Sequence, residues 1–138
     1  TLTKFTVKER YCLQQNVYFE ARNQSTLGQV SVAWVTLNRM DSKKFPSTIC
    51  KVIWQNKQFS WTHDGKRDSP GKSKVEQLAW TMAGHVVEAV LQDYVWGRNS
   101  DAVGRALFYH ADYVKPVWRH NLIKVAKIDN HIFYKDKL

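Results

Sequence analysis

The chain has 138 residues, and its 21 basic and 12 acidic side chains give a formal net charge of +9. Six tryptophans, six tyrosines and six phenylalanines exceed the aromatic content of a disordered basic tail. A chain of about 150 residues buries roughly two thirds of its unfolded surface, so we expect one folded domain over residues 1–138. The positive charge favours a polyanionic partner, whether nucleic acid, acidic lipid or a wall polymer, and selects none of them.

No stretch of the chain predicts a membrane span, which needs about 18 apolar residues. Residues 23–38, the longest uncharged stretch, are interrupted by polar side chains, and residues 1–10 contain no apolar signal region. We therefore expect export to depend on other factors. Cys12 and Cys50 lie far apart without a Cys-x-x-Cys pair, which favours two buried thiols and leaves one bridge open.

The first predicted element is a helix. Residues 6–9 have the form of a capping box, in which a hydroxyl and a carboxylate satisfy the free amides of a helix start. The helix is expected to run to about Arg22. Leu13, Val17 and Glu20 then lie on one face, because residues three and four apart are neighbours on a helix.

A second helix is predicted to begin with the capping pattern of residues 26–29. Val30, Ala33, Trp34 and Leu37 follow at the spacing of a core-facing helix. This is the clearest periodic signal in the sequence.

The middle of the chain predicts shorter elements. Ser47 or Thr48 is expected to cap a short helix that ends near Trp54. Residues 58–62 alternate like a β-strand, and the glycines and proline of residues 63–72 indicate an exposed, mobile loop.

A long helix is predicted after a third capping box at residues 73–76, reaching about Leu91. Its apolar positions repeat at helical spacing, which predicts the central buried helix of the domain: Val75, Leu78, Ala79, Met82, Val86 and Val90.

The C-terminal part changes character. Residues 106–110, 122–128 and 131–134 are strand-like, and Asp129-Asn130 between the last two indicates a hairpin. Helices followed by a small antiparallel sheet predict the α+β class.

Glu20 is the first candidate for chemistry. It shares a helix face with apolar side chains, and a carboxyl that loses hydration there should have a raised pKa, as a general acid requires. The alternative is a structural salt bridge to Arg22 or Arg39.

Other chemistries have little support. The sequence lacks HExxH, GxSxG, P-loop and dinucleotide motifs, so we predict no cofactor and no local metal motif. A zinc site assembled in space stays open among the five histidines, namely His63, His85, His110, His120 and His131. Aromatic side chains in the strand-like and loop segments suit the core or a groove that stacks on sugars or bases: Phe59, Trp61, Phe108, Tyr109, Trp118, Phe133 and Tyr134.

Several motifs nevertheless occur in one order over about residues 9–134: Asn16-Val17-Tyr18-Phe19-Glu20-Ala21-Arg22, Gly28-Gln29, Val32-Ala33-Trp34-Val35, Leu37-Asn38-Arg39, Pro46-Ser47-Thr48-Ile49-Cys50, Gln58-Phe59-Ser60-Trp61, Ala106-Leu107-Phe108-Tyr109-His110-Ala111, Pro116-Val117-Trp118 and His131-Ile132-Phe133-Tyr134. Together they closely resemble the SleB-type cell wall hydrolases, a family of spore-cortex lytic enzymes, related wall enzymes and phage endolysins.

The resemblance implies a fold similar to lysozyme and the lytic transglycosylases, cleavage of the glycan strand of peptidoglycan, and Glu20 as the catalytic acid. Candidate hydrogen-bonding residues for the substrate are Gln58, Ser60, Tyr109 and His110, and candidate stacking residues are Phe59, Trp61, Phe108 and Trp118. No wall-binding repeat and no signal sequence accompany these motifs, which suits a bare catalytic module such as an endolysin released into the wall.

The expected partner is peptidoglycan, and the protein is expected to be a monomer. One motif carboxylate favours a lytic transglycosylase, whereas hydrolysis ordinarily uses two carboxyl groups, for which Asp64, Asp68 or Asp112 would be the second. A zinc amidase built from His63, His110 or His131, and a basic nucleic-acid-binding module, are the competing interpretations.

Overall fold

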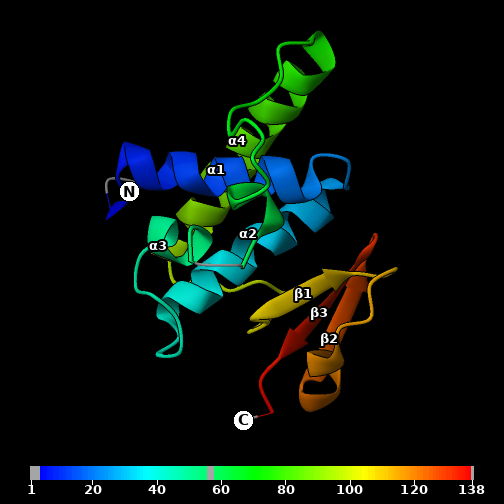
Figure 1. The fold of residues 1–138 in the computed structure, drawn as a ribbon. Coiled ribbons are helices and arrows are strands. Elements are labelled where there is room, and N and C mark those ends of the chain that lie inside the picture. The colour runs from blue at the N-terminus through cyan, green and yellow to red at the C-terminus, as the bar shows by residue number, and fades with distance from the viewer. Residues whose placement is uncertain (1–3, 56–57, 138) are drawn as a thin grey trace.

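The computed structural model describes residues 4–55 and 58–137 and confirms the α+β class (Figure 1). The helices form one body, and three strands lie together at its side. In chain order the elements are α1 (Val7–Ala21), α2 (Thr26–Asp41), α3 (Ile49–Ile53), the 3₁₀ helix η2 (Ser60–Thr62), α4 (Lys74–Val95), β1 (Phe108–Ala111), the 3₁₀ helix η3 (Val117–Asn121), β2 (Ile123–Ile128) and β3 (His131–Lys135). No helix among the described residues is both long and apolar enough to cross a membrane.

The helix starts follow the capping chemistry, with one correction. Thr6 and Glu9 form the predicted box at α1, and Thr48 caps α3. The cap of α2 is Ser25, one residue before the predicted Thr26: its Oγ accepts from the Gly28 amide. The Asp129 carboxylate accepts from both the Ser25 amide (2.9 Å) and the Ser25 hydroxyl (2.6 Å), so a distant residue fixes this position.

The core lies where α1, α2, α3 and α4 meet. Leu13 and Val17 of α1 and Ala33 and Leu37 of α2 are fully buried, as their helical spacing predicts, whereas Val30 is only half-buried. These contacts orient the last turn of α1, which carries Glu20.

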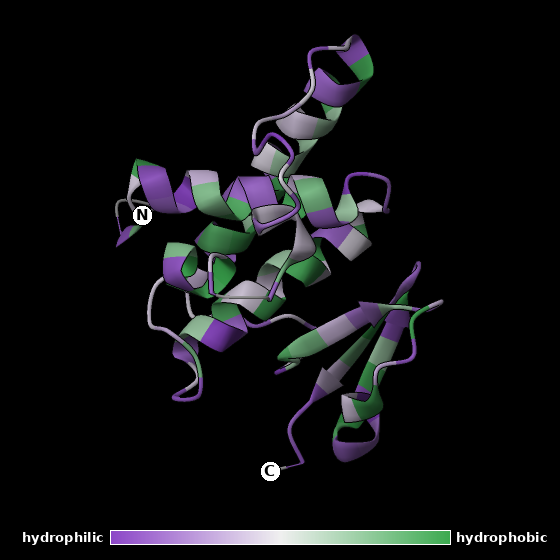
Figure 2. Ribbon diagram, viewed as in Figure 1, coloured by the Kyte–Doolittle hydropathy of each residue, from purple (hydrophilic) through white to green (hydrophobic). Residues whose placement is uncertain are grey.

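The prediction of a central buried α4 is wrong for its first half. Val75, Leu78 and Met82 are 76%, 66% and 46% exposed. The second half of the helix instead buries one face, made of Ala83, Val86, Val87, Val90 and Leu91. Figures 1 and 2 show the first turns projecting beyond the helical body, with apolar residues on the projecting part. Periodicity marks an apolar face, and packing decides whether anything covers it.

Residues 58–62 form no strand, contrary to prediction. Ser60–Thr62 is a 3₁₀ turn, closed by the Thr62 amide and hydroxyl, which both donate to the Phe59 carbonyl. The strand-like alternation of residues 58–62 arises because Phe59 and Trp61 are buried although the backbone forms a turn. Residues 63–72 form the predicted mostly exposed loop, and its mobility stays a prediction.

The sheet has the order β1-β3-β2, and both pairings are antiparallel. The Asp129-Asn130 hairpin is confirmed, and Asp129 adopts a φ of 52° in its turn. Because successive strand residues point to opposite faces, Tyr109 and Phe133 face one side, while His110 and Tyr134 face the other.

The favoured prediction of two free thiols is wrong, because Cys12 and Cys50 form a disulfide. Their Cα atoms lie 5.4 Å apart, and the bond joins α1 to α3 across 38 residues of sequence. Only the packing of α3 against α1 brings the two sulfurs together.

Candidate active site

Glu20 lies in the last turn of α1, partly exposed, on the face that also carries the buried Leu13 and Val17. The Tyr109 hydroxyl donates a hydrogen bond of 2.6 Å to its Oε1 atom. Burial raises the pKa of Glu20, while the Tyr109 hydrogen bond and the Arg39 charge act in the opposite direction. Since burial dominates, Glu20 has the raised pKa that its sequence position predicts.

Tyr109 is the donor of this pair. Burial raises its pKa well above the usual range, and the neighbouring Glu20 carboxyl raises it further, against smaller opposing effects of Arg39 and Asn16. The phenol therefore stays protonated and holds one oxygen of Glu20, which leaves Oε2 as the oxygen that Tyr109 does not engage.

Asn16 lies one helical turn before Glu20 and is fully buried. Its Oδ1 atom accepts from the Trp61 indole (2.8 Å), and its Nδ2 atom has no hydrogen-bond partner in the part of the chain that the structure describes. The Trp61 ring also stacks on Phe19 at 5.0 Å. These contacts fix η2 against α1 beside the acid.

Arg39 was predicted only as a possible salt-bridge partner of Glu20 and as the last residue of the Leu37-Asn38-Arg39 motif, with no role in the site. Its guanidinium is buried from α2, and its charge acts on both Glu20 and Tyr109. The available signals were a charged residue within the core-facing second helix and its place in that motif. Arg22, the other proposed partner, instead lies over the Tyr18 ring at 4.9 Å.

The residues of the 58–61 motif differ in exposure: two are exposed and two are buried. Gln58 is exposed, and its Oε1 atom accepts from Arg39 Nη1 at 3.1 Å, while Ser60 is also exposed. Phe59 and Trp61 are 4% and 5% exposed, so their rings support the site from within the core and offer little surface to a sugar.

His110 and Trp118 are placed away from Glu20. His110 Nε2 lies 2.8 Å from the Tyr134 hydroxyl, its Nδ1 lies 2.7 Å from the Ala111 carbonyl, and the Trp118 ring packs over this pair. Their contacts belong to the sheet face opposite Tyr109. Phe108 contacts Trp118 and also the Arg39 guanidinium, at the edge between the two groups.

Two of the three candidate second carboxylates, those of Asp64 and Asp112, have other partners, and Asp68 is tied to α1 through its backbone. Asp64 accepts from the Lys66 amide within its own loop, and Asp112 pairs with Lys127 at 3.4 Å. The Asp68 carbonyl accepts from the Gln15 side chain, which ties the loop to α1. Among the described residues no group of three His, Cys, Asp or Glu side chains is arranged to hold a metal ion.

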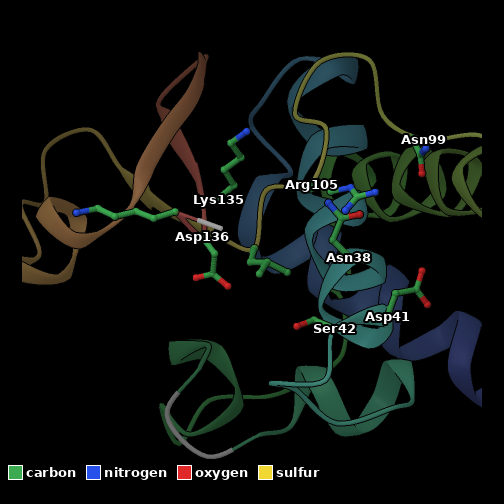
Figure 3. A pocket seen from close by; sticks show the side chains of 9 residues that line it. Asn38, Asp41, Ser42, Asn99, Arg105, Lys135 and Asp136 are labelled. Atoms are coloured by element: carbon green, nitrogen blue, oxygen red, sulfur yellow. The ribbon is translucent and has the colours of Figure 1, made fainter.

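A cavity of about 620 Å³ lies where the end of α2, the segment before β1 and the C-terminal residues meet (Figure 3). Figure 3 shows the helical side chains facing Lys135 and Asp136 across it. The lining residues are Asn38, Asp41, Ser42, Asn99, Arg105, Leu107, Lys135, Asp136 and Lys137. The Leu107 carbonyl accepts from Arg39, so the cavity adjoins the Arg39 side of the site.

A carboxyl with a raised pKa, held by a tyrosine between helices and a small sheet, is suited to general acid catalysis. The profile of the family described as Cell Wall Hydrolase matches residues 23–134, so the chain belongs to that family. Glu20 lies just before the matched range.

Relatives of known description are similar to most of this chain. The spore cortex-lytic enzyme of Bacillus cereus is 36% identical over 120 residues, which cover 86% of this chain and 41% of the relative. That of Oceanobacillus iheyensis is 32% identical, with 86% of this chain and 38% of the relative covered. The chain thus spans about two fifths of these relatives.

The catalytic domain of the germination-specific lytic transglycosylase SleB from Bacillus anthracis has a similar structure. It superposes with a TM-score of 0.76 at 28% identity, covering 96% of this chain and 98% of the other. The catalytic domain of the Bacillus cereus SleB protein gives 0.72, also at 28% identity, covering 95% and 93%. The fold is therefore the lysozyme-like fold of these domains, as the sequence motifs imply.

Proposed function

We propose that this domain cleaves the glycan strand of peptidoglycan between N-acetylmuramic acid and N-acetylglucosamine, with Glu20 as the catalytic acid and base. The observation that carries the proposal is the Glu20 carboxyl itself, which burial keeps protonated more readily and which one hydrogen bond orients. The similarity to spore cortex-lytic enzymes and to a lytic transglycosylase domain supports the substrate class.

The reaction uses one carboxyl group twice. Glu20 first gives its proton to the glycosidic oxygen, and the C1–O bond breaks as the N-acetylglucosamine hydroxyl leaves. The resulting carboxylate then takes the proton of the muramoyl C6 hydroxyl while that oxygen bonds to C1. The product has a 1,6-anhydro ring, Glu20 is protonated again, and no water is consumed.

The residues around Glu20 have different proposed roles. Because Tyr109 holds Oε1, Oε2 is the oxygen that carries the catalytic proton in this proposal. Gln58, which contacts Arg39, and Ser60 are both exposed and are the proposed hydrogen-bonding contacts to the sugar. His110 and Trp118, on the opposite sheet face, are not assigned to the cleavage step.

The alternative is a muramidase that hydrolyses the same bond. Mass spectrometry of digested peptidoglycan separates the two, because transglycosylation gives anhydro ends that are lighter than hydrolysed ends by one water. We expect anhydro ends without label from ¹⁸O-water. Labelled reducing ends would establish hydrolysis and make Asp64, Asp68 and Asp112 the next residues to replace.

Two other activities make different predictions. A zinc amidase would lose activity with a chelator and would release stem peptides. A nucleic-acid-binding module would bind single-stranded DNA tightly without lysing walls, with affinity that falls steeply with salt. We expect chelator-insensitive glycan cleavage by a monomer that acts at the bacterial wall.

A further inference from the structure

Arg39 occupies an unusual position for a charged side chain. It is 4% exposed, and its guanidinium carbon lies within 4.9 to 5.6 Å of the ring centroids of Phe45, Phe59 and Phe108. Burying a cation is costly unless other groups compensate it. The burial of Arg39 therefore indicates that its side chain has a specific role in the folded protein.

The guanidinium joins two segments that both contribute to the site. Arg39 Nε donates to the Leu107 carbonyl at 2.7 Å, and Nη1 donates to the Gln58 side chain at 3.1 Å. Leu107 lies two residues before Tyr109, and Gln58 lies two residues before the Ser60–Thr62 turn that carries Trp61. One planar group therefore spans the strand that presents Tyr109 and the turn that leans on Asn16.

No carboxylate lies within ion-pair distance of Arg39 in residues 4–55 and 58–137. Burial lowers the pKa of Arg39, and the charges of Tyr109 and Glu20 oppose that effect. Because the Tyr109 phenol stays protonated, the Glu20 carboxylate is the ionised group that compensates the buried cation.

We propose that Arg39 is the positioning residue of the catalytic acid, because its guanidinium fixes the Tyr109 strand and the Gln58 turn around Glu20. This rests on the proposed function. Its positive charge also favours the carboxylate that remains once Glu20 has released its proton. Burial alone would make the acid hold that proton too firmly, so the buried cation moderates the acid that burial creates.

Two substitutions separate position from charge. Arg39→Met keeps an apolar chain and loses both hydrogen bonds and the charge, whereas Arg39→Lys keeps the charge and loses the planar, two-point geometry. Arg22→Met is the matched control, since Arg22 is exposed, follows Glu20 closely in sequence and lies over Tyr18. Each folded protein is assayed for glycan cleavage across pH, with kcat and KM measured separately and a thermal melt beside them.

We expect kcat to fall about 100-fold in both Arg39 variants, because misplacing reacting groups by about 1 Å has effects of that size. The alkaline limb of kcat/KM should move to higher pH in Arg39→Met, where Glu20 loses a group that lowers its pKa, and stay near the wild-type position in Arg39→Lys. Arg22→Met should match the wild type in both.

A folded Arg39→Met protein with wild-type kcat and an unmoved alkaline limb would overturn the proposal and leave only a structural role. If Arg39→Met does not fold, Arg39→Lys decides: a lowered kcat supports the proposal, and a wild-type kcat overturns it. Failure of the proposed function looks different, because the wild-type protein itself would then release no glycan fragments.

Discussion

Breaking the disulfide is the perturbation whose magnitude the structure allows to be worked out. Cys12 and Cys50 close a loop with a sequence separation of 38. In the chain-entropy treatment, a crosslink of that span stabilises the folded state by about 4 kcal/mol. With an unfolding entropy of about 2.1 cal/mol/K per residue, that loss lowers Tm by roughly 14 °C.

The measurement is a thermal melt of the wild type with and without reductant, beside a Cys12→Ala/Cys50→Ala protein. Cys50 is partly exposed and lines an open groove of about 500 Å³ with Tyr11 and Trp54, so a small thiol can reach the bond. Reductant should lower the wild-type Tm and leave the double variant unchanged. Titration of two free thiols in the unreduced, denatured wild type, or a Tm indifferent to reductant, would refute the reasoning.

Three other predictions follow from the site and the caps. Glu20→Gln should fold yet lose cleavage by about 100- to 10,000-fold. Because the pKa of Glu20 is raised in the folded state, its ionisation lowers the stability of the wild type as the pH rises above 4.5. The Tm of the variant relative to that of the wild type should therefore rise from acidic to alkaline pH. A folded variant that clears walls at the wild-type rate would end the assignment. Tyr109→Phe should move the alkaline limb of kcat/KM to higher pH, since Glu20 loses a hydrogen bond that lowers its pKa; an unmoved limb contradicts this. Ser25→Ala should cost about 1 to 2 kcal/mol in denaturant unfolding, with Thr26→Ala, its matched control, near neutral; equal losses would argue against Ser25 as the cap.

The sequence by itself determined the features that depend on near neighbours. A hydroxyl and a carboxylate three residues apart encode the start of α1, and apolar spacing encodes the buried faces of α1 and α2. Asp129-Asn130 between two strand-like runs encodes the hairpin. The position of Glu20 on an apolar face predicts the direction of its pKa shift, because that shift depends chiefly on lost hydration.

Only the tertiary structure decided which distant residues these elements contact. Tyr109 reaches Glu20 across 89 residues, Arg39 reaches Leu107 across 68, and Asp129 selects Ser25 as a cap across 104. The disulfide and the uncovered first half of α4 likewise follow from how the helices pack. Local patterns specify backbone hydrogen bonds and periodic faces within a few residues, whereas the partner of each face is set by the packing of the whole core.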